Sequence, residues 1–137
     1  MIQNINNHPK SRKKRILVVD DEQDLTYTLK AILNENGSFQ VETFTDPVLA
    51  LSEFKAGTYD LAVLDIRMPG MNGFQLCRKL RDVDNKLKIC FLTAAELHYY
   101  QETDSDVIRD LGTDCFVQKP VDNEYFVKNI EAILRQK

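Results

Sequence analysis

The sequence predicts an α/β fold in which helices cover both faces of a five-stranded parallel sheet, the doubly wound arrangement. Segments of strand and helix character alternate about five times along the chain. Several of the strand segments are continuous apolar runs, which is typical of strands buried on both faces. Several of these runs are followed at once by an acidic or hydroxyl residue. With 137 residues, the chain is long enough for one domain with its own core.

The first half of the chain shows this alternation clearly. Continuous apolar runs predict strands at Arg15–Asp20 and Tyr59–Leu64, and a short strand is expected at Phe39–Phe44. Between the first two strands, apolar residues at helical spacing predict a helix over Glu22–Asn36, which Gly37 ends. The apolar residues of that helix are Leu25, Leu29, Ile32 and Leu33.

Two further helices follow the second and third strands. One is expected to begin at Thr45-Asp46-Pro47 and to end at Gly57, because proline suits a first helical turn. The other begins at Asn72, after a loop that contains proline and glycine. Their apolar positions are Val48, Leu51 and Phe54 in the first helix, and Phe74, Leu76, Cys77 and Leu80 in the second.

The last third of the chain predicts two strands, Leu87–Leu92 and Asp114–Val117. Between them, Ala94–Leu111 is polar and helix-prone. After a break at Lys119-Pro120, an amphipathic helix is expected over Asn123–Arg135. Its apolar residues are Tyr125, Phe126, Ile130, Ile133 and Leu134.

Composition and charge exclude several classes of protein. A hydrophobic fraction of 43% with 28% charged residues argues against disorder, and a net charge of −3 argues against a protein that coats nucleic acid or a membrane. The chain has neither an apolar run long enough to span a bilayer nor the apolar segment of a secretory signal. The odd number and the spacing of Cys77, Cys90 and Cys115 favour free thiols. We therefore expect a cytoplasmic protein.

Residues 1–14 differ from the rest because they are polar, rich in asparagine and then basic. They predict a flexible arm before a folded domain over residues 15–137. The basic cluster between Lys10 and Arg15 could contact an acidic partner or nucleic acid, although such clusters are more often solvated tails.

Polar residues stand directly after the apolar runs. They are Asp20, Asp21, Asp65, Thr93 and Lys119. In open α/β sheets, functional groups gather outside the carboxyl ends of the strands, so we expect these side chains to meet at one edge. Taken singly, each could be a helix cap, a turn former or a surface lysine. Their occurrence at matching strand ends favours a functional site.

The chemistry of this set points to phosphoryl transfer. Carboxylates at close range raise one another's pKa and need a cation, and oxygen donors without Cys or His suit Mg²⁺. Magnesium also binds phosphate oxygens. Lys119 and Thr93 could hold phosphoryl oxygens, and a carboxylate such as Asp65 can attack phosphorus to form an acyl phosphate.

Four segments resemble the motifs of response-regulator receiver domains, in that family's order. Val18–Glu22 resembles the acidic-pair motif, and Leu64–Gly73 resembles the phosphoacceptor strand with its loop. Leu92–Ala94 and Lys119-Pro120 match the remaining two motifs. The resemblance runs from Arg15 nearly to the end of the chain. It implies a flavodoxin-like (βα)5 fold with strand order 2-1-3-4-5.

The resemblance also implies roles for individual residues. Asp65 would accept the phosphoryl group from a phosphohistidine of a sensor histidine kinase or a phosphotransfer protein. Asp21, Asp65 and the backbone carbonyl of Arg67 would bind Mg²⁺, and Asp20 would act mainly through metal-bound water.

The remaining roles concern the phosphoryl group and the switch. Lys119 and Thr93 would hold phosphoryl oxygens, and the small Ala94 would leave room for them. Phe116 falls at the position of the switch aromatic, whose ring turns inward when Thr93 moves. The family commonly has a cis bond at Lys119-Pro120.

Two features depart from the family pattern. The stretch from Thr93 to Lys119 is a few residues longer than usual, and it lies on the usual output surface. Phe116 lacks a hydroxyl group, so a switch would rely on packing.

The expected function is a phosphoacceptor module that catalyses only its own phosphorylation and dephosphorylation and signals to a downstream protein. After the last expected helix, the sequence holds only Arg135-Gln136-Lys137. No attached DNA-binding domain is therefore expected. A monomer or a weak, phosphorylation-dependent dimer is expected. Alternatives are a degenerate receiver that binds partners without phosphate and, less favoured, an aspartyl-phosphate hydrolase. A flavin-binding protein of the same fold is not supported, because this sequence shows no loop for the flavin phosphate.

Overall fold

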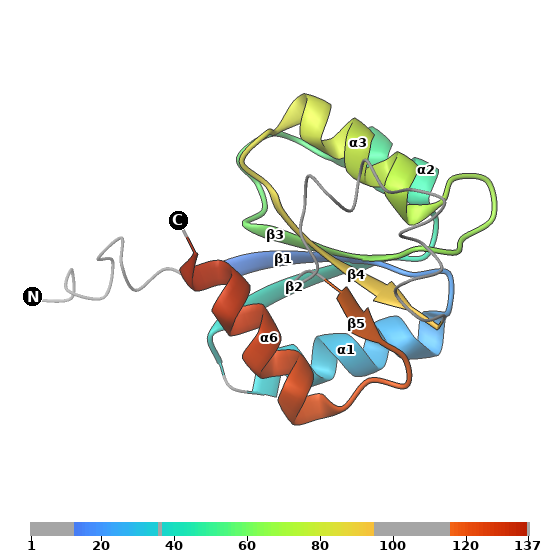
Figure 1. Ribbon diagram of the computed structural model, residues 1–137. Helices are drawn as coiled ribbons and strands as arrows, with labels where there is room; N and C mark the ends of the chain where they lie inside the picture. The colour runs from blue at the N-terminus through green and yellow to red at the C-terminus, as the bar shows by residue number, and fades with distance from the viewer. Residues whose placement is uncertain (1–12, 36, 95–115, 137) are drawn as a thin grey trace, which may run out of the picture.

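The described part of the chain forms one parallel sheet with helices on both faces (Figure 1). The computed structural model describes residues 13–35, 37–94 and 116–136. The strands are β1 (Lys14–Val19), β2 (Phe39–Phe44), β3 (Leu61–Asp65), β4 (Lys88–Thr93) and β5 (Phe116–Gln118). The helices are α1 (Gln23–Glu35), α2 (Pro47–Glu53), α3 (Gly73–Val83) and α6 (Asn123–Arg135).

The strands lie in the order β2-β1-β3-β4-β5, and every neighbouring pair is parallel. This confirms the expected doubly wound sheet and the strand order 2-1-3-4-5. The register aligns Val19 of β1 with Leu64 of β3, and Asp65 with Leu92 of β4. The carboxyl ends of the central strands therefore lie side by side.

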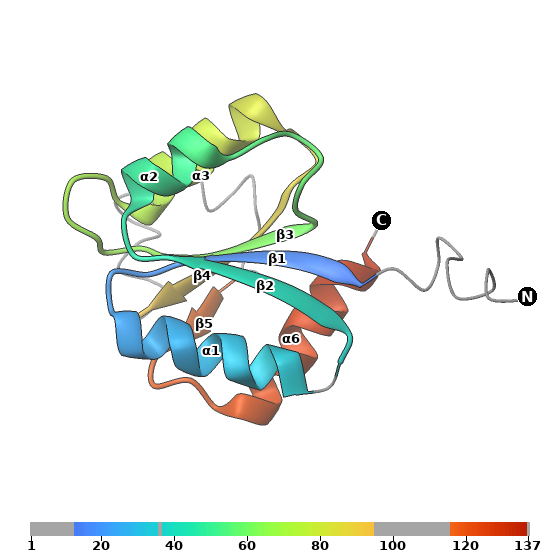
Figure 2. The ribbon, with the colours of Figure 1, turned by 180° about the vertical axis from the view of Figure 1, so that it is seen from behind.

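Each face of the sheet has its own apolar core. Helices α2 and α3 cover one face, and α1 and α6 cover the other, as the views from both sides show (Figure 2). Successive residues of β1 point to opposite faces: Leu17 and Val19 pack in the core under α2 and α3, whereas Ile16 and Val18 pack under α1 and α6. This two-sided burial explains why the strands are continuous apolar runs.

Most helical faces agree with the sequence pattern. Leu29, Ile32 and Leu33 of α1 are buried, and Leu25 is partly buried. The four expected apolar residues of α3 are all buried, and a reciprocal capping box between Asn72 and Gln75 begins that helix. In α6, Phe126, Ile130 and Ile133 are buried, but Tyr125 is 57% exposed. In the described residues, no helix is long and apolar enough to cross a membrane.

Helix α2 is shorter than expected. It ends at Glu53 and not at Gly57, because Phe54 adopts an extended backbone conformation that sends its ring into the core. There the ring stacks on Tyr59 with 6.0 Å between ring centroids. Val48 is also 55% exposed, because the buried face of this helix consists of Pro47 and Ala50.

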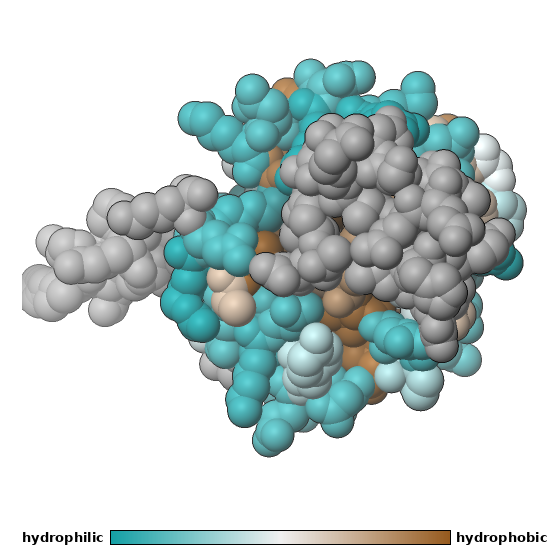
Figure 3. Space-filling view, viewed as in Figure 1, coloured by the Kyte–Doolittle hydropathy of each residue, from teal (hydrophilic) through white to brown (hydrophobic). Residues whose placement is uncertain are grey.

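Several expectations concern residues outside the described part. They include the arm up to residue 12, the helix predicted over Ala94–Leu111 beyond Ala94 itself, and Cys115. Cys77 and Cys90 are buried and form no disulfide, as expected. In the space-filling view, the described surface on this side is mostly hydrophilic, with a smaller hydrophobic area in the lower middle where β5 lies (Figure 3).

Candidate functional site

The polar residues that follow the apolar runs meet at the carboxyl edge of the sheet, as expected. The backbone hydrogen-bond ladder continues past the strand ends and holds them there. The amide of Asp20 donates to Phe44 O (3.1 Å), and the amide of Lys119 donates to Thr93 O (2.8 Å). The amide that follows Asp65 donates to Leu92 O (3.0 Å). Residues that are far apart in the chain are thus fixed by neighbouring strands.

Three carboxylates form the centre of the site. One oxygen from each of Asp20, Asp21 and Asp65 lies within 4.8 Å of the others. Asp20 is fully buried and Asp65 is 5% exposed, whereas Asp21 is exposed. Asp20 Oδ1 accepts a hydrogen bond from the Glu22 amide (2.9 Å). Asp20 Oδ2 is also buried, and it faces the Lys119 ammonium at 3.0 Å.

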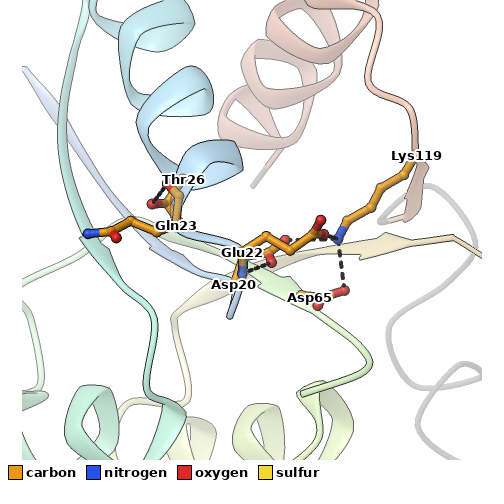
Figure 4. Close-up of polar contacts among 6 residues, drawn as sticks. All are labelled: Asp20, Glu22, Gln23, Thr26, Asp65 and Lys119. Atoms are coloured by element: carbon orange, nitrogen blue, oxygen red, sulfur yellow. Dashed lines mark hydrogen bonds and ion pairs between the residues drawn. The ribbon is translucent and has the colours of Figure 1, made fainter. Parts of the chain in front are cut away.

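Lys119 brings the positive charge into this cluster. Its side chain reaches in from the loop after β5 and ends between Glu22 and Asp65 (Figure 4). Lys119 Nζ lies 2.8 Å from Glu22 Oε1, 3.0 Å from Asp20 Oδ2 and 3.4 Å from Asp65 Oδ1. The Lys119–Pro120 peptide bond is cis, as the family resemblance implies.

Burial makes the negative charge of this cluster costly. Burial, together with the neighbouring Asp20 carboxylate, raises the pKa of Asp65 to about 6, although Lys119 opposes the shift. Burial also raises the pKa of Asp20, against the Glu22 amide and the Lys119 ammonium. Burial alone would lower the pKa of Lys119, but hydrogen bonds to Glu22 and Asp20 raise it above its usual range.

These properties fit a hard divalent cation such as Mg²⁺. The cluster offers only carboxylate oxygens, the donor type that Mg²⁺ prefers. The single Lys119 ammonium faces the carboxylates of Asp20, Asp65 and Glu22, so negative charge exceeds positive charge at these partly buried oxygens, which is costly unless a further cation offsets it. Burial is the main cause of the raised pKa values of Asp20 and Asp65, because it disfavours their charged forms, and a bound cation would offset that penalty.

The remaining predicted residues surround a small open cavity beside Asp65. The cavity has a volume of about 260 Å³. Its lining consists of Asp21, Glu22, Asp65, Arg67, Thr93, Ala94 and Lys119. Thr93 is buried, and Ala94 is exposed at the cavity mouth. The site residues predicted from the sequence, with the exception of Phe116 and the buried Asp20, thus line one space.

Phe116 lies on β5, which β4 separates from the strand of Asp65, β3. It is half-buried on β5, and its ring packs against Phe91 of β4 with 5.3 Å between ring centroids. Phe91 in turn makes an edge-to-face contact with Phe74 of α3 at 4.8 Å. The ring therefore already packs with the core under α2 and α3.

Two residues of the site had no role in the sequence analysis. Glu22 gives Lys119 its nearest carboxylate, and its signal was the third acid in Asp-Asp-Glu. Gly73 packs against the end of β3. A Cβ atom at this position would approach Asp65 O to 2.4 Å and Ile66 Cα to 2.9 Å. Its signal was the Asn-Gly pair, which also has the plain interpretation of a turn.

Comparison with known proteins agrees with the fold and identifies the family. The family model described as the response regulator receiver domain matches residues 16–131. The regulatory protein VanRB of Enterococcus faecalis is 36% identical over 124 residues, which are 89% of this chain and 53% of that protein. The sensory transduction protein RegX3 of Mycobacterium tuberculosis is 33% identical over 121 residues, covering 88% of this chain and 51% of that protein.

Solved structures show the same likeness. The non-phosphorylated HemR receiver domain of Leptospira biflexa superposes with a TM-score of 0.77 at 31% identity, covering 91% of this chain and 97% of that one. A CheY-like receiver domain protein of Methanospirillum hungatei gives a TM-score of 0.73 at 27% identity, covering 90% and 94%.

Fold and site together define a phosphoacceptor α/β domain of two-component signalling. The chain belongs to the response regulator receiver domain family, whose members are signalling regulators and not classical enzymes. It spans about half the length of the curated relatives that it matches.

Proposed function

We propose that Asp65 is the phosphoacceptor of this receiver domain and takes its phosphoryl group from a histidine kinase or a phosphotransfer protein. One observation carries this proposal: Asp65 lies between an acidic pair and Lys119 and opens onto a cavity that Thr93 and Ala94 also line. A carboxylate in this position has a cation site on one side and phosphoryl-binding groups on the other.

The residues have distinct roles in the transfer. A carboxylate oxygen of Asp65 attacks phosphorus, and the bond from phosphorus to the donor nitrogen breaks. Lys119 and the Thr93 hydroxyl hold the phosphoryl oxygens, and Ala94 leaves space for them at the cavity mouth. Asp20, Asp21, Asp65 and the Arg67 carbonyl are the groups that would hold Mg²⁺. The ion supplies charge neutralisation when it is bound.

The output would follow from movement at Thr93. If Thr93 moves toward the phosphoryl group, the space next to Phe116 changes, and Phe116 responds through its packing on Phe91. Because Phe116 has no hydroxyl group, the switch depends on ring packing alone. We also propose that the protein acts in the cytoplasm.

Other expectations stay predictions. They are the flexible arm over residues 1–14, the folded unit over 15–137, an unidentified downstream protein, and a monomer or weak phosphorylation-dependent dimer. The domain would catalyse only its own phosphorylation and dephosphorylation.

The alternatives have less support. A degenerate receiver would lack part of the acceptor set, yet Asp20, Asp21, Asp65, Thr93 and Lys119 are all present. An aspartyl-phosphate hydrolase of the Asp-x-Asp type has its nucleophile after the first strand, whereas Asp65 ends the third and Arg67 occupies the place of the second acid.

Phosphorylation with a small donor tests the proposal. The protein is incubated with acetyl phosphate and Mg²⁺, and an acid-stable, base-labile phosphoryl adduct is sought by mass spectrometry. We expect one adduct on the wild type and none on Asp65→Asn. Asp82→Asn, at an exposed carboxylate of α3, is the matched control and should be labelled like the wild type. Equal labelling of Asp65→Asn would falsify the assignment.

A further inference from the structure

We propose that Glu22 is a positioning residue that holds Lys119 in the resting site and is displaced from it by the phosphoryl group. This inference rests on the proposed function, because it takes Asp65 as the acceptor and Lys119 as the phosphoryl-binding group. It adds a carboxylate that competes with the phosphoryl group for Lys119. This carboxylate belongs to Glu22, which directly precedes α1 and has no role in the proposed phosphoryl transfer.

The distances show how the ammonium group is shared. Glu22 Oε1 is its nearest carboxylate oxygen at 2.8 Å, and Asp65 Oδ1 is the most distant of its three partners at 3.4 Å. Lys119 Nζ has three donor hydrogens. A hydrogen directed at Glu22 cannot bind a phosphoryl oxygen on Asp65. In the resting arrangement the ammonium is therefore drawn toward α1 and away from the acceptor (Figure 4).

Burial distinguishes Glu22 from the other partners of the lysine. The Glu22 side chain is 64% exposed, whereas Asp20 is fully buried and the Lys119 side chain is 15% exposed. An exposed carboxylate can rotate into water at small cost, because exposed ion pairs are weak. Glu22 is thus the partner that can leave without exposing a buried charge.

The backbone of Glu22 is held firmly while its carboxylate is free to move. Its amide donates to Asp20 Oδ1 (2.9 Å), and its carbonyl accepts from the amides of Leu25 and Thr26 (3.1 Å each). The Glu22→Gln variant keeps these backbone bonds and the length of the side chain. It removes only the charge that retains Lys119.

The consequence is measurable as affinity for a phosphoryl mimic. In Glu22→Gln, Lys119 no longer leaves a charged partner to reach the mimic, so binding of beryllofluoride in saturating Mg²⁺ should strengthen by about two- to fivefold at low salt, the range expected for a pair with one exposed member. The gain should shrink at about 0.5 M NaCl, because salt screens exposed charges.

A double-mutant cycle separates this effect from a general change of charge. Calorimetry gives the beryllofluoride affinity of the wild type, Glu22→Gln, Lys119→Met and the double variant, and circular dichroism checks that each is folded. A general charge effect would act equally with and without Lys119, whereas displacement of Glu22 acts only when Lys119 is present. Asp24→Asn removes an exposed carboxylate two residues away and should leave the affinity unchanged.

The outcomes are distinct. A gain in Glu22→Gln that vanishes in the Lys119→Met background supports the proposal. If the Lys119→Met proteins bind too weakly to measure, a salt-sensitive gain that Asp24→Asn lacks supports it. An equal gain in both backgrounds, an unchanged affinity or a weaker one overturns it while the phosphoacceptor function stands. A wild type that binds no beryllofluoride overturns both.

Discussion

At the scale of single residues, the main feature of the site is the buried negative charge of Asp65, which makes folding less favourable. Asp65 is 5% exposed and lies beside the fully buried Asp20, and the Lys119 ammonium is 3.4 Å from its Oδ1. Its pKa is raised from the ordinary value of 3.8 to about 6. At pH values between these two, the folded protein holds a proton on Asp65 that the unfolded chain has released. Folding is thus less favourable when Asp65 is ionised.

We expect the metal-free protein to become more stable as the pH falls from 7.5 to 5. The folded state takes up a proton as the pH passes through about 6, and the unfolded state does so only near 3.8. Asp65→Asn removes the ionised form, so it should raise the melting temperature at pH 7.5 by about 3–6 °C. At pH 5 this gain should largely disappear.

Thermal unfolding in EDTA at both pH values measures this effect. Asp82→Asn, at an exposed carboxylate on α3, serves as the control and should change the melting temperature little at either pH. A gain for Asp65→Asn that is the same at pH 5 and pH 7.5 would show that charge burial is not its cause.

At the scale of elements, the start of α3 determines where the acceptor strand ends. The Gly73 amide donates to Ile66 O (2.8 Å), and the Asn72–Gln75 capping box begins the helix directly beside that contact. The close approach of backbone to backbone is possible because Gly73 has no Cβ atom. The loop after Asp65 and the first turn of α3 therefore form one packed unit.

We expect Gly73→Ala to destabilise the protein by about 1–3 kcal/mol, the usual cost of overpacking. The new Cβ would meet the backbone of Asp65 and Ile66, which cannot move aside as a flexible side chain could. Urea unfolding measures the change. Lys79→Ala, at an exposed position of the same helix, should leave stability nearly unchanged, and an equal effect of the two variants would contradict the packing argument.

At the scale of the whole molecule, two apolar layers support one polar edge. The cores under α2 and α3 and under α1 and α6 hold the central strands from both sides, and the acidic cluster lies where these strands end. A cation bound there would contact Asp65 of β3 and the carboxylates of Asp20 and Asp21, which follow β1. Those groups come together only in the folded state, so binding is linked to folding.

We expect Mg²⁺ to stabilise the whole domain. At about 100 times its dissociation constant, an ion that binds only the folded state adds about 2.7 kcal/mol to the free energy of unfolding. Chemical unfolding with Mg²⁺ and with EDTA, at matched ionic strength, measures the difference. The double variant Asp20→Asn/Asp65→Asn should lose the response, and a response equal to that of the wild type would place the ion elsewhere.

Much of the fold could be predicted because its signals are local. The continuous apolar runs predicted the strands to within one or two residues wherever the structure describes them, and helical spacing predicted the buried faces of α1 and α3. The end of α2 was wrong because Phe54 leaves the helix to reach the core, and the burial gained there depends on the tertiary structure.

The sequence by itself determined which side chains stand at the strand ends, because each apolar run is followed directly by its polar residue. Only the tertiary structure decided how they share charge. Glu22 and Lys119 are 97 residues apart, so their 2.8 Å contact depends on the order of β1, β3, β4 and β5 in the sheet. The contact of Gly73 with Asp65 O likewise depends on how α3 packs. Local pattern identifies donors and acceptors, and strand order with helix packing determines which of them meet.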